Sequence, residues 1–457
     1  MNLGNDYIIE LLKKTGNEIY IVGGVVRDIL LGRENHDKDI IVVDVSAKEF
    51  AEKFATDNDG VCITLDEENN IYRVVMSDKI NYVDITNPIN NSLEEDIKRR
   101  DLTINAIAVN IKTGDIVDLV NGLEDTRKGI IRGISEQNFI DDPLRIIRAY
   151  RFSSVLGFEI YSSTREYLRR HLDKILQPAV ERRNVEIIKL FGGKNAHNIL
   201  LEMDNDGVID VLFPIMKDVK KVPSNTHHHL DLFHHSVETV KQIQKIYENS
   251  CDEVKEHLEQ VDFGGDSRLA HLKFSGFLHD IGKFSTWTIE GDRHRFIRHD
   301  EVGADLAKKI LKQNKFSKKQ IEYISLMVRN HIYPSGVVSS PNLNEKIYMR
   351  YIRKAGDNAI DMIVLAQADR LSARGVAITD EMVNDNISAL NKLLNFYISV
   401  KSTLKPIPKL LSGEEIMKLK NIKPSKELGK IISALHDAQL EGDVLTKDDA
   451  INFVMKI

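Results

Sequence analysis

Cysteine is nearly absent from this chain, which has only Cys62 and Cys251 among its 457 residues. Two cysteines do not build a disulfide framework, so the composition excludes a small disulfide-stapled secreted protein and predicts a cytoplasmic location, where thiols stay reduced. No apolar run is long enough to span a bilayer, and residues 2–14 show the pattern of a charged amphipathic helix instead of a signal peptide. We therefore expect no membrane partner.

An excess of basic residues is also missing. The chain has 63 lysines and arginines against 69 aspartates and glutamates, which gives a net charge of −6. Any contact with nucleic acid must therefore depend on a local basic surface of an otherwise acidic protein. The length predicts several domains instead of a single core.

The local pattern changes near residue 125. Before it, short β-rich runs alternate with helical segments; after it, strand signals nearly vanish and helical periodicity takes over. This predicts an α/β head with a mixed sheet and helices, followed by an elongated all-α body. Residues 249–268, with mixed charge and two glycines, read as a surface loop. The domains that we expect are a head at 1–125, a helical neck at 126–200, a connecting segment at 201–230, a histidine-bearing domain at 231–375 and a helical tail at 376–457.

Residues 19–39 carry the most informative pattern of the chain. A strand at 19–22 runs into Gly23-Gly24, where backbone N–H groups can approach a phosphate chain without an intervening Cβ atom. A short helix then carries Arg27, whose guanidinium suits phosphate oxygens. The turn and the arginine together predict a site for a nucleoside triphosphate.

Asp37 and Asp39 open the next predicted strand. Side chains alternate along a strand, so both carboxylates lie on one face, where they can share divalent cations that activate a hydroxyl. Asp84 lies on a further predicted strand. It is either a third carboxylate of the same site or an exposed strand residue, and the sequence leaves both interpretations open.

The order and spacing of these residues resemble the head of the class II nucleotidyltransferases, the family of bacterial CCA-adding enzymes and poly(A) polymerases. The resemblance implies a nucleotidyltransferase palm with Mg²⁺ at Asp37 and Asp39. Residues 99–106 resemble the second motif of this family. By that resemblance Arg100 contacts the triphosphate, while Asp101 and Asn105 support the nucleotide pocket.

Residues 141–145 resemble the base-recognition motif of the family, which usually starts with glutamate where this chain has aspartate. Cytosine and adenine each offer an amino donor beside a ring-nitrogen acceptor, which a carboxylate and a guanidinium can satisfy. Uracil and guanine present the opposite order and would leave buried groups unpaired. Asp142 and Arg145 would therefore accept CTP and ATP without a template. Arg148 and Arg151 follow at intervals of three and extend the nucleotide-binding set.

The histidine-bearing domain resembles the HD superfamily of metal-dependent phosphohydrolases. Its signature is the His279-Asp280 pair, with histidines before and after it and a closing aspartate. Imidazole and carboxylate ligands suit one or two divalent metal ions, whose identity the sequence leaves open. The residues that match are His235, His279, Asp280, His299, His331 and Asp369.

The resemblance implies an enzyme that adds CCA to the 3′ end of tRNA from CTP and ATP. One departure matters, because the flexible loop of CCA-adding members looks shortened to residues 87–92. Among relatives, loss of this loop goes with enzymes that add only two cytidines and leave the adenosine to a separate A-adding enzyme. The alternatives are therefore a CC-adding enzyme, then a poly(A) polymerase, then an HD phosphohydrolase, and last a pure RNA-binding module.

Overall fold

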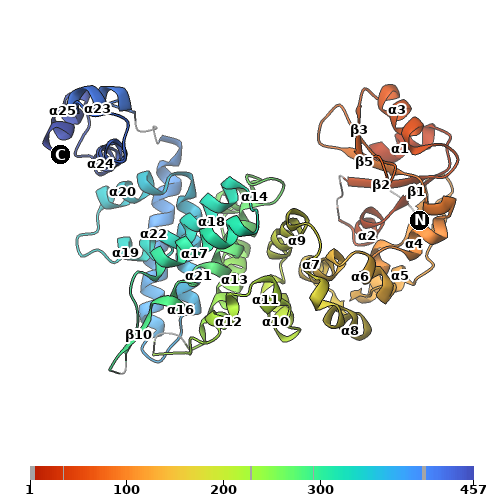
Figure 1. The fold of residues 1–457 in the computed structure, drawn as a ribbon, viewed down its shortest axis with the longest axis horizontal. Helices are drawn as coiled ribbons and strands as arrows, with labels where there is room; N and C mark the ends of the chain where they lie inside the picture. Colours follow the sequence, from red (N-terminus) through yellow and green to blue (C-terminus); the bar gives the residue numbers. More distant parts are fainter. Residues whose placement is uncertain (1–5, 34, 36, 227–228, 292, 404–407) are drawn as a thin grey trace. The chain divides into compact units, whose positions relative to one another are not determined.

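The structure is a computed structural model that describes residues 6–33, 35, 37–226, 229–291, 293–403 and 408–457, without the side chains of residues 37, 440 and 441. The chain divides into two compact units, Met1–Pro214 and Ile215–Ile457, and each is described by itself (Figure 1). Within the described residues, no helix is long and apolar enough to cross a membrane.

A mixed seven-stranded sheet forms the first part of unit one, as the α/β pattern predicts. Its order is β3-β4-β5-β2-β1-β6-β7. Strands β2 and β5 pair in parallel, and the other neighbours pair antiparallel. The strands are β1 (Ile19–Val22), β2 (Asp37–Val42), β3 (Val61–Asp66), β4 (Ile71–Val75), β5 (Tyr82–Thr86), β6 (Ala108–Asn110) and β7 (Ile116–Val117).

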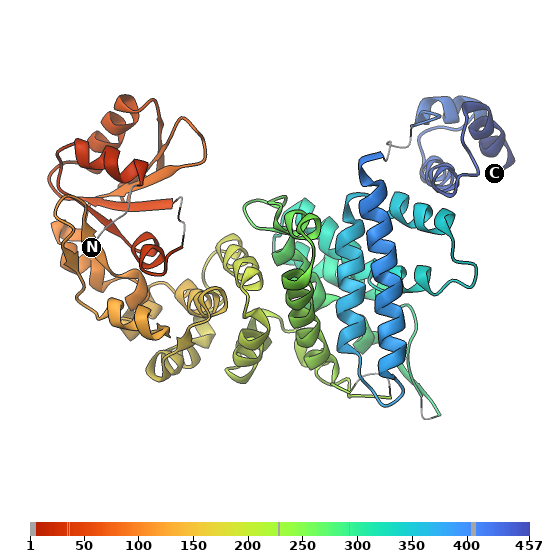
Figure 2. The same cartoon turned by 180° about the vertical axis from the view of Figure 1, so that it is seen from behind.

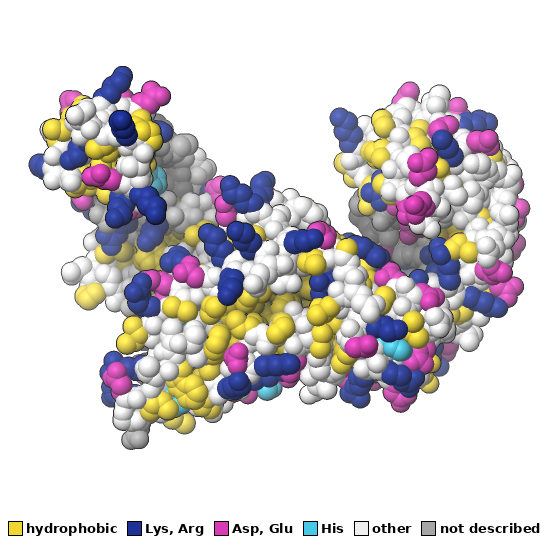
Figure 3. Space-filling view, viewed as in Figure 1, with side chains coloured by type: hydrophobic (Ala, Val, Ile, Leu, Met, Phe, Trp, Pro, Cys, Tyr) yellow, Lys and Arg dark blue, Asp and Glu magenta, His cyan; other side chains and the backbone are white. Residues whose placement is uncertain are grey.

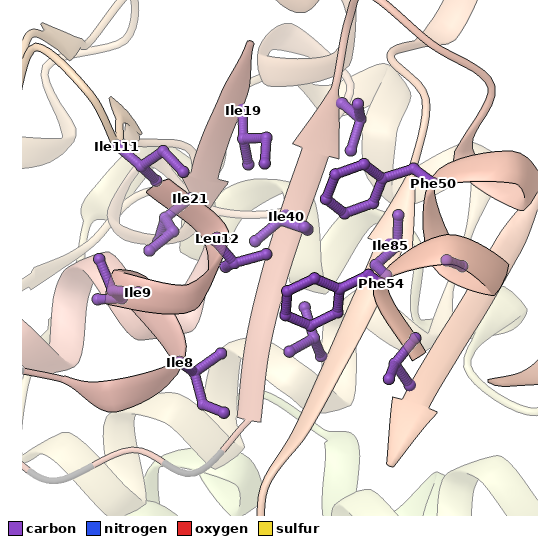
Figure 4. Close-up of a cluster of buried hydrophobic side chains, with 14 of the residues drawn as sticks. Ile8, Ile9, Leu12, Ile19, Ile21, Ile40, Phe50, Phe54, Ile85 and Ile111 are labelled. Carbon is purple, nitrogen blue, oxygen red and sulfur yellow. The ribbon is translucent and has the colours of Figure 1, made fainter. Parts of the chain in front are cut away.

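One face of this sheet is covered by α1 (Tyr7–Lys14) and α3 (Ala47–Asp57). Phe50 and Phe54, one helical turn apart on α3, stack at 5.8 Å and pack over the buried strand residues (Figure 4). Ile40 belongs to this core. Because neighbours along a strand point to opposite faces, Asp39 points to the other face, which the helices of the core leave open.

Short helices connect the sheet to the helical remainder of unit one. A small parallel pair, β8 (Ile130–Ile131) with β9 (Glu159–Ile160), lies among them. The helices are α2 (Gly24–Leu30), α4 (Leu93–Lys98), α5 (Gly122–Lys128), α6 (Glu136–Asp141), α7 (Leu144–Leu156), α8 (Ser162–Arg170), α9 (Val180–Gly192), α10 (Ala196–Asn205) and α11 (Val208–Leu212).

Unit two is mainly helical, and α13, α21 and α22 run side by side in both views (Figures 1 and 2). Leu411, Ile416 and Leu435 belong to a separate small core under the last three helices. The helices are α12 (Met216–Val219), α13 (Leu232–Asn249), α14 (Asp252–Glu259), α15 (Arg268–Leu278), α16 (Lys283–Thr286), α17 (His299–Gln313), α18 (Lys318–Asn330), α19 (Tyr333–Val338), α20 (Glu345–Ala355), α21 (Ala359–Ser372), α22 (Asp380–Val400), α23 (Gly413–Lys420), α24 (Lys426–Glu441) and α25 (Lys447–Lys456).

Two features of unit two correct the sequence prediction. The surface loop expected at residues 249–268 contains α14, whose Val254 and Leu258 lie one turn apart and are fully buried. The charged residues between Val254 and Leu258 made this segment look like a surface loop, although it is a short amphipathic helix. A hairpin of β10 (Trp287–Glu290) and β11 (Arg293–Phe296) also interrupts the helices, in a region where the sequence shows almost no strand signal. Most of its residues are exposed, so no buried apolar alternation marks it.

Candidate functional site

The turn after β1 brings the backbone against two predicted site residues. Gly23 has φ 77° and precedes α2, and a Cβ atom there would lie 3.1 Å from Nη1 of Arg100 and 3.4 Å from Oδ2 of Asp39. Only glycine combines a positive φ with this close approach at low cost. The turn therefore leaves room for a ligand between the carboxylate and the guanidinium.

Gly23→Ala should weaken nucleotide binding strongly, because the new methyl group would crowd Arg100 and Asp39. Gly32→Ala is a matched control, since Gly32 also has a positive φ (66°) but a Cβ atom there meets nothing within 4 Å. Both variants should lose about 1–2 kcal/mol of stability from backbone strain. CTP affinity should fall at least tenfold in Gly23→Ala alone, measured by isothermal titration calorimetry. Equal CTP affinities in the two variants would contradict this account of the turn.

Carboxylates and an arginine form a row across the open face of the sheet. Asp39 on β2 is in register with Asp84 on β5, and Asp84 with Arg73 on β4. Arg73 donates through Nε and Nη2 to the two carboxylate oxygens of Asp84, at 2.7 Å each. Asp84 is thus a half-buried residue that lies beside Asp39 and is held by Arg73. The side chain of Asp37 lies outside the described part of the structure, which gives only its backbone position in β2.

A buried hydrogen-bond network joins the predicted nucleotide-binding residues. Arg27 donates from Nη1 to Oδ1 of Asn105 at 2.5 Å, and Asn105 donates from Nδ2 to Oδ1 of Asp101 at 3.1 Å. Arg148 donates from Nε to Oδ2 of Asp101 at 2.8 Å. Arg100 donates from Nε and Nη2 to Asp96 at 3.1 and 3.0 Å, and from Nη1 to the carbonyl of Asn105 at 3.4 Å. The arginine after the glycine turn is therefore coupled to the arginines of α7.

Asp101 is the buried charge at the centre of this network. Burial by itself raises its pKa, but the charge of Arg148 and the hydrogen bonds from Arg148, Asn105 and the Leu102 amide lower the pKa to about 2. The carboxylate therefore stays ionised at neutral pH and fixes the guanidinium of Arg148 in one position.

Glu186 on α9 completes the network and was not foreseen from the sequence. It accepts from Nε of Arg151 at 2.9 Å and lies 3.5 Å from Nη1 of Arg148. The ring of Phe152, also not foreseen, lies 3.6 Å from the Arg151 guanidinium carbon and 5.0 Å from that of Arg27. In the sequence, Glu186 stands out only as a carboxylate on an arginine-rich helix, which does not by itself indicate a role in the site.

Asp142 and Arg145 lie at the start of α7. Oδ1 of Asp142 accepts from the Leu144 amide at 3.2 Å, and Oδ2 accepts from Nη2 of Arg182 at 3.0 Å. Arg145 donates from Nη1 to the carbonyl of Asn138 at 2.9 Å. These contacts hold a carboxylate and a guanidinium three residues apart at the first turn of one helix.

Most of these side chains line one cavity of about 780 Å³ in unit one; Arg73 lies outside its lining. The cavity brings together the glycine turn, the carboxylates and the arginines from segments far apart in the sequence, and Glu186, Phe152 and Lys189 lie on its wall as well. The sequence-predicted residues that it collects are Gly23, Gly24, Arg27, Asp39, Asp84, Arg100, Asp101, Asn105, Asp142, Arg145, Arg148 and Arg151.

Several other neck arginines form structural ion pairs. Nη1 of Arg165 lies 3.1 Å from Oδ2 of Asp206, and Nη2 of Arg169 lies 2.5 Å from Oδ1 of the same residue. The side chain of Asp206 is fully buried and also accepts from the hydroxyl of Tyr150 at 2.8 Å. Arg170 pairs with Glu136 at 2.6 Å. These contacts fix the helices of the neck to one another.

Unit two holds a second cluster of candidate ligands, in which Asp280 is shared. His235, His279, Asp280 and Asp369 place ligand atoms within 4.8 Å of one another, and Asp280, His299 and His331 do the same. Asp280 lies 3.1–3.5 Å from the four imidazole Nε2 atoms. A carboxylate shared between two ligand groups suits two neighbouring cations.

The chemistry of this cluster fits divalent metal ions. The Asp280 carboxylate is buried, its Oδ2 pairs with Nζ of Lys283 at 2.6 Å, and its Oδ1 faces Nε2 of His299 and His331. Nδ1 of His279, His299 and His331 faces a backbone carbonyl at 2.7–2.8 Å. A carbonyl only accepts, so Nδ1 carries the proton and Nε2 presents its lone pair to the cluster.

His235→Ala should remove most of the bound metal, whereas His234→Ala should leave it. His235 is buried in the cluster, while its neighbour His234 is half-exposed and pairs with Asp231 at 2.7 Å. Loss of a ligand typically costs a large factor in metal affinity, here at least tenfold. Metal content after dialysis, measured by plasma mass spectrometry, checks this; equal content in the two variants would contradict the ligand assignment.

The chain is similar to known proteins in both sequence and fold. Three family models match: a poly A polymerase head domain at residues 19–132, a probable RNA and SrmB-binding site of polymerase A at 157–220, and an HD domain at 232–374. The chain is 31% identical to a CC-adding tRNA nucleotidyltransferase of Thermus thermophilus, over 96% of this chain and 94% of that protein. It is 29% identical to an A-adding tRNA nucleotidyltransferase of Deinococcus radiodurans, over 95% and 94%. The Thermotoga maritima CCA-adding enzyme complexed with tRNA has a similar fold, with a TM-score of 0.55 at 20% identity, over 98% and 93%.

Proposed function

The chain belongs to the tRNA nucleotidyltransferase and poly(A) polymerase family, and we propose that it adds CCA to the 3′ end of tRNA from CTP and ATP without a template. One observation carries this proposal: a single cavity holds Asp39, the glycine turn, and the Asp142 and Arg145 pair. Such a cavity brings reacting groups, triphosphate contacts and base-reading groups within the reach of one nucleotide.

In this proposal the triphosphate lies against the backbone N–H groups of the Gly23-Gly24 turn, Arg27 and Arg100. Asp37 and Asp39 would hold Mg²⁺, which when bound supplies charge stabilisation at the reacting phosphate and lowers the pKa of the attacking hydroxyl. The RNA 3′-oxygen forms a bond to the α-phosphorus as its proton is released, and the bond from that phosphorus to the bridging oxygen breaks. Pyrophosphate leaves with the electron pair, so the RNA gains one nucleotide.

Base choice is assigned to Asp142 and Arg145. The carboxylate accepts from the exocyclic amine of cytosine or adenine, and the guanidinium donates to the ring nitrogen beside it. The ordered network through Asp101, Arg148 and Glu186 positions the same helix, so the base meets groups that are already fixed. Uracil and guanine would instead place a carbonyl oxygen against the carboxylate and an N–H group against the guanidinium, so that neither pair could form a hydrogen bond.

Substrate class is tested by giving each of the four nucleoside triphosphates to two RNAs with Mg²⁺. The RNAs are a tRNA transcript without its 3′ CCA and an unstructured oligonucleotide. We expect extension of the tRNA by CTP and little extension with UTP or GTP. Long adenosine tails on the unstructured RNA would instead show a poly(A) polymerase.

A CC-adding enzyme is the second candidate, and the loop after β5 favours it. Asn87 ties this loop to the sheet: its Nδ2 donates to the carbonyls of Val42 and Val45, and its Oδ1 accepts from the Ala47 amide, at 2.8 Å each. The loop then turns through a short helix, Ile89–Asn91, and leads into α4. A loop this short and this firmly held offers little freedom to reshape the pocket for ATP. A separate A-adding enzyme would then be the partner.

Phosphoester hydrolysis at the metal cluster of unit two is a candidate additional activity. A cavity of about 500 Å³ opens beside the cluster and is lined by His299, His331, Asp369, Lys283 and Arg370. Nε of Arg370 is buried without a hydrogen-bond partner among the described residues, which suits contact with a phosphate. Release of phosphate from nucleotides or cyclic phosphates should be lost in His279→Ala and kept in Asp39→Ala. The reverse pattern would rule the activity out.

A further inference from the structure

An apolar strip lies on the edge strand of the catalytic sheet. On β3, Val61, Ile63 and Leu65 are 62%, 44% and 47% exposed. Between them, Cys62 packs against the core under α3. Val61 and Ile63 therefore share the open face of the sheet, and Leu65, at a shift in the register, lines the cavity on that face. Figure 3 shows hydrophobic side chains over the margin where Figure 1 labels β3. Within the described residues, neither helix of the core covers this face.

Strand register connects the strip to the reacting carboxylate. Ile63 on β3 is opposite Arg73 on β4, Arg73 is opposite Asp84 on β5, and Asp84 is opposite Asp39 on β2. Residues opposite one another on neighbouring strands share a face. Leu65 also lines the nucleotide cavity together with Asp39. The strip is thus continuous with the cavity floor.

The geometry of nucleotidyl transfer indicates which part of the RNA lies over the apolar strip, and this step rests on the proposed function. In nucleotidyl transfer the attacking and leaving oxygens lie roughly in line on opposite sides of the phosphorus. The triphosphate contacts, Gly23-Gly24 and Arg27, lie at the β1 and α2 side of Asp39. The nucleotide that carries the attacking hydroxyl must therefore approach over β5, β4 and β3.

We propose that the face formed by Val61, Ile63, Leu65, Arg73 and Tyr82 binds the unpaired 3′-terminal nucleotides of the RNA. Unpaired bases have free apolar faces that pack against hydrophobic side chains and planar guanidinium groups. Arg73 stacks over the ring of Tyr82, with its guanidinium carbon 4.0 Å from the centroid, and its ion pair with Asp84 holds the guanidinium plane in place. Because this face continues into the cavity that holds Asp39, the RNA end is favoured over a second copy of the chain at the edge strand.

The test compares a double variant, Val61→Asp with Ile63→Asp, with the control Ile80→Asp. Ile80 is 65% exposed in the turn between β4 and β5 and lies outside the cavity. All three positions are exposed, so the variants should keep the melting temperature of the parent protein. We expect KM for tRNA lacking CCA to rise at least tenfold in the double variant, with KM for CTP unchanged, and no change in the control.

A crosslink supplies the direct readout. A tRNA transcript that ends in 5-iodocytidine is irradiated on the full-length protein, and the attached peptide is identified by mass spectrometry. Attachment within residues 61–82 supports the proposal. Attachment elsewhere, or an unchanged KM for tRNA in an enzyme that still adds nucleotides, overturns it while the proposed function stands. A change of oligomeric state with unchanged KM would identify a second copy as the occupant and also overturns it. Failure of the parent protein to extend tRNA would instead defeat the proposed function itself.

Discussion

Asp39→Ala is expected to abolish nucleotide transfer while leaving tRNA binding intact, and Asp37→Ala should do the same. In our account these carboxylates hold the metal ions that stabilise the reacting phosphate, a contribution of several kcal/mol. Its loss corresponds to a rate decrease of about 10³-fold or more. Single-turnover extension of a tRNA lacking CCA measures the rate, and filter binding measures the affinity for tRNA.

Asp57→Ala is the matched control for these variants. Asp57 is an exposed carboxylate at the end of α3, on the helix that covers the opposite face of the sheet. It should transfer nucleotides at the parent rate. If both Asp37→Ala and Asp39→Ala lost tRNA binding, the carboxylates would have a structural role and the assignment of metal ligands would be wrong.

Arg145→Ala should relax base choice more than it weakens RNA affinity. Its guanidinium is the proposed donor to the ring nitrogen of cytosine or adenine, and half-burial next to Asp142 makes an unmatched base costly. Loss of one such hydrogen bond to a charged group should lower kcat/KM for CTP by roughly 10- to 100-fold. The preference for CTP over UTP should fall with it, as measured by competition between the two nucleotides.

Arg127→Ala provides the comparison for Arg145→Ala. Arg127 has a side chain that is 77% exposed and pairs with Glu124 on the surface of α5, away from the cavity. It should leave the CTP to UTP ratio unchanged. An unchanged ratio in Arg145→Ala as well would refute the role given to this arginine.

The head could be predicted well because its signals are local. The strand expected at residues 19–22 is β1 with the same bounds, and the expected mixed α/β head is confirmed by the sheet. Alternation along β2 places Ile40 in the core and Asp39 on the open face. The two-residue periodicity of a strand and a glycine turn depend only on neighbouring residues, so both could be predicted from the sequence.

Residues that act through tertiary contacts could not be predicted in this way. Glu186 meets Arg151 across 35 positions of sequence, and Arg73 meets Asp84 only because β4 and β5 pair. The buried Asp361 binds His257 at 2.6 Å across 104 positions. Each of these residues looks like an ordinary surface charge in a local window, and only the packing of separate elements gives it a partner.

The most direct test of the central claim is the mass of a tRNA that has been incubated with the purified protein. A transcript lacking its last three nucleotides is given CTP alone, ATP alone and both together, with Mg²⁺, and the products are weighed by mass spectrometry. Our account predicts C-C with CTP alone, no addition with ATP alone, and C-C-A with both. A halt after C-C despite ample ATP would contradict CCA addition and identify a CC-adding enzyme. No addition of cytidine under any condition would contradict the account as a whole.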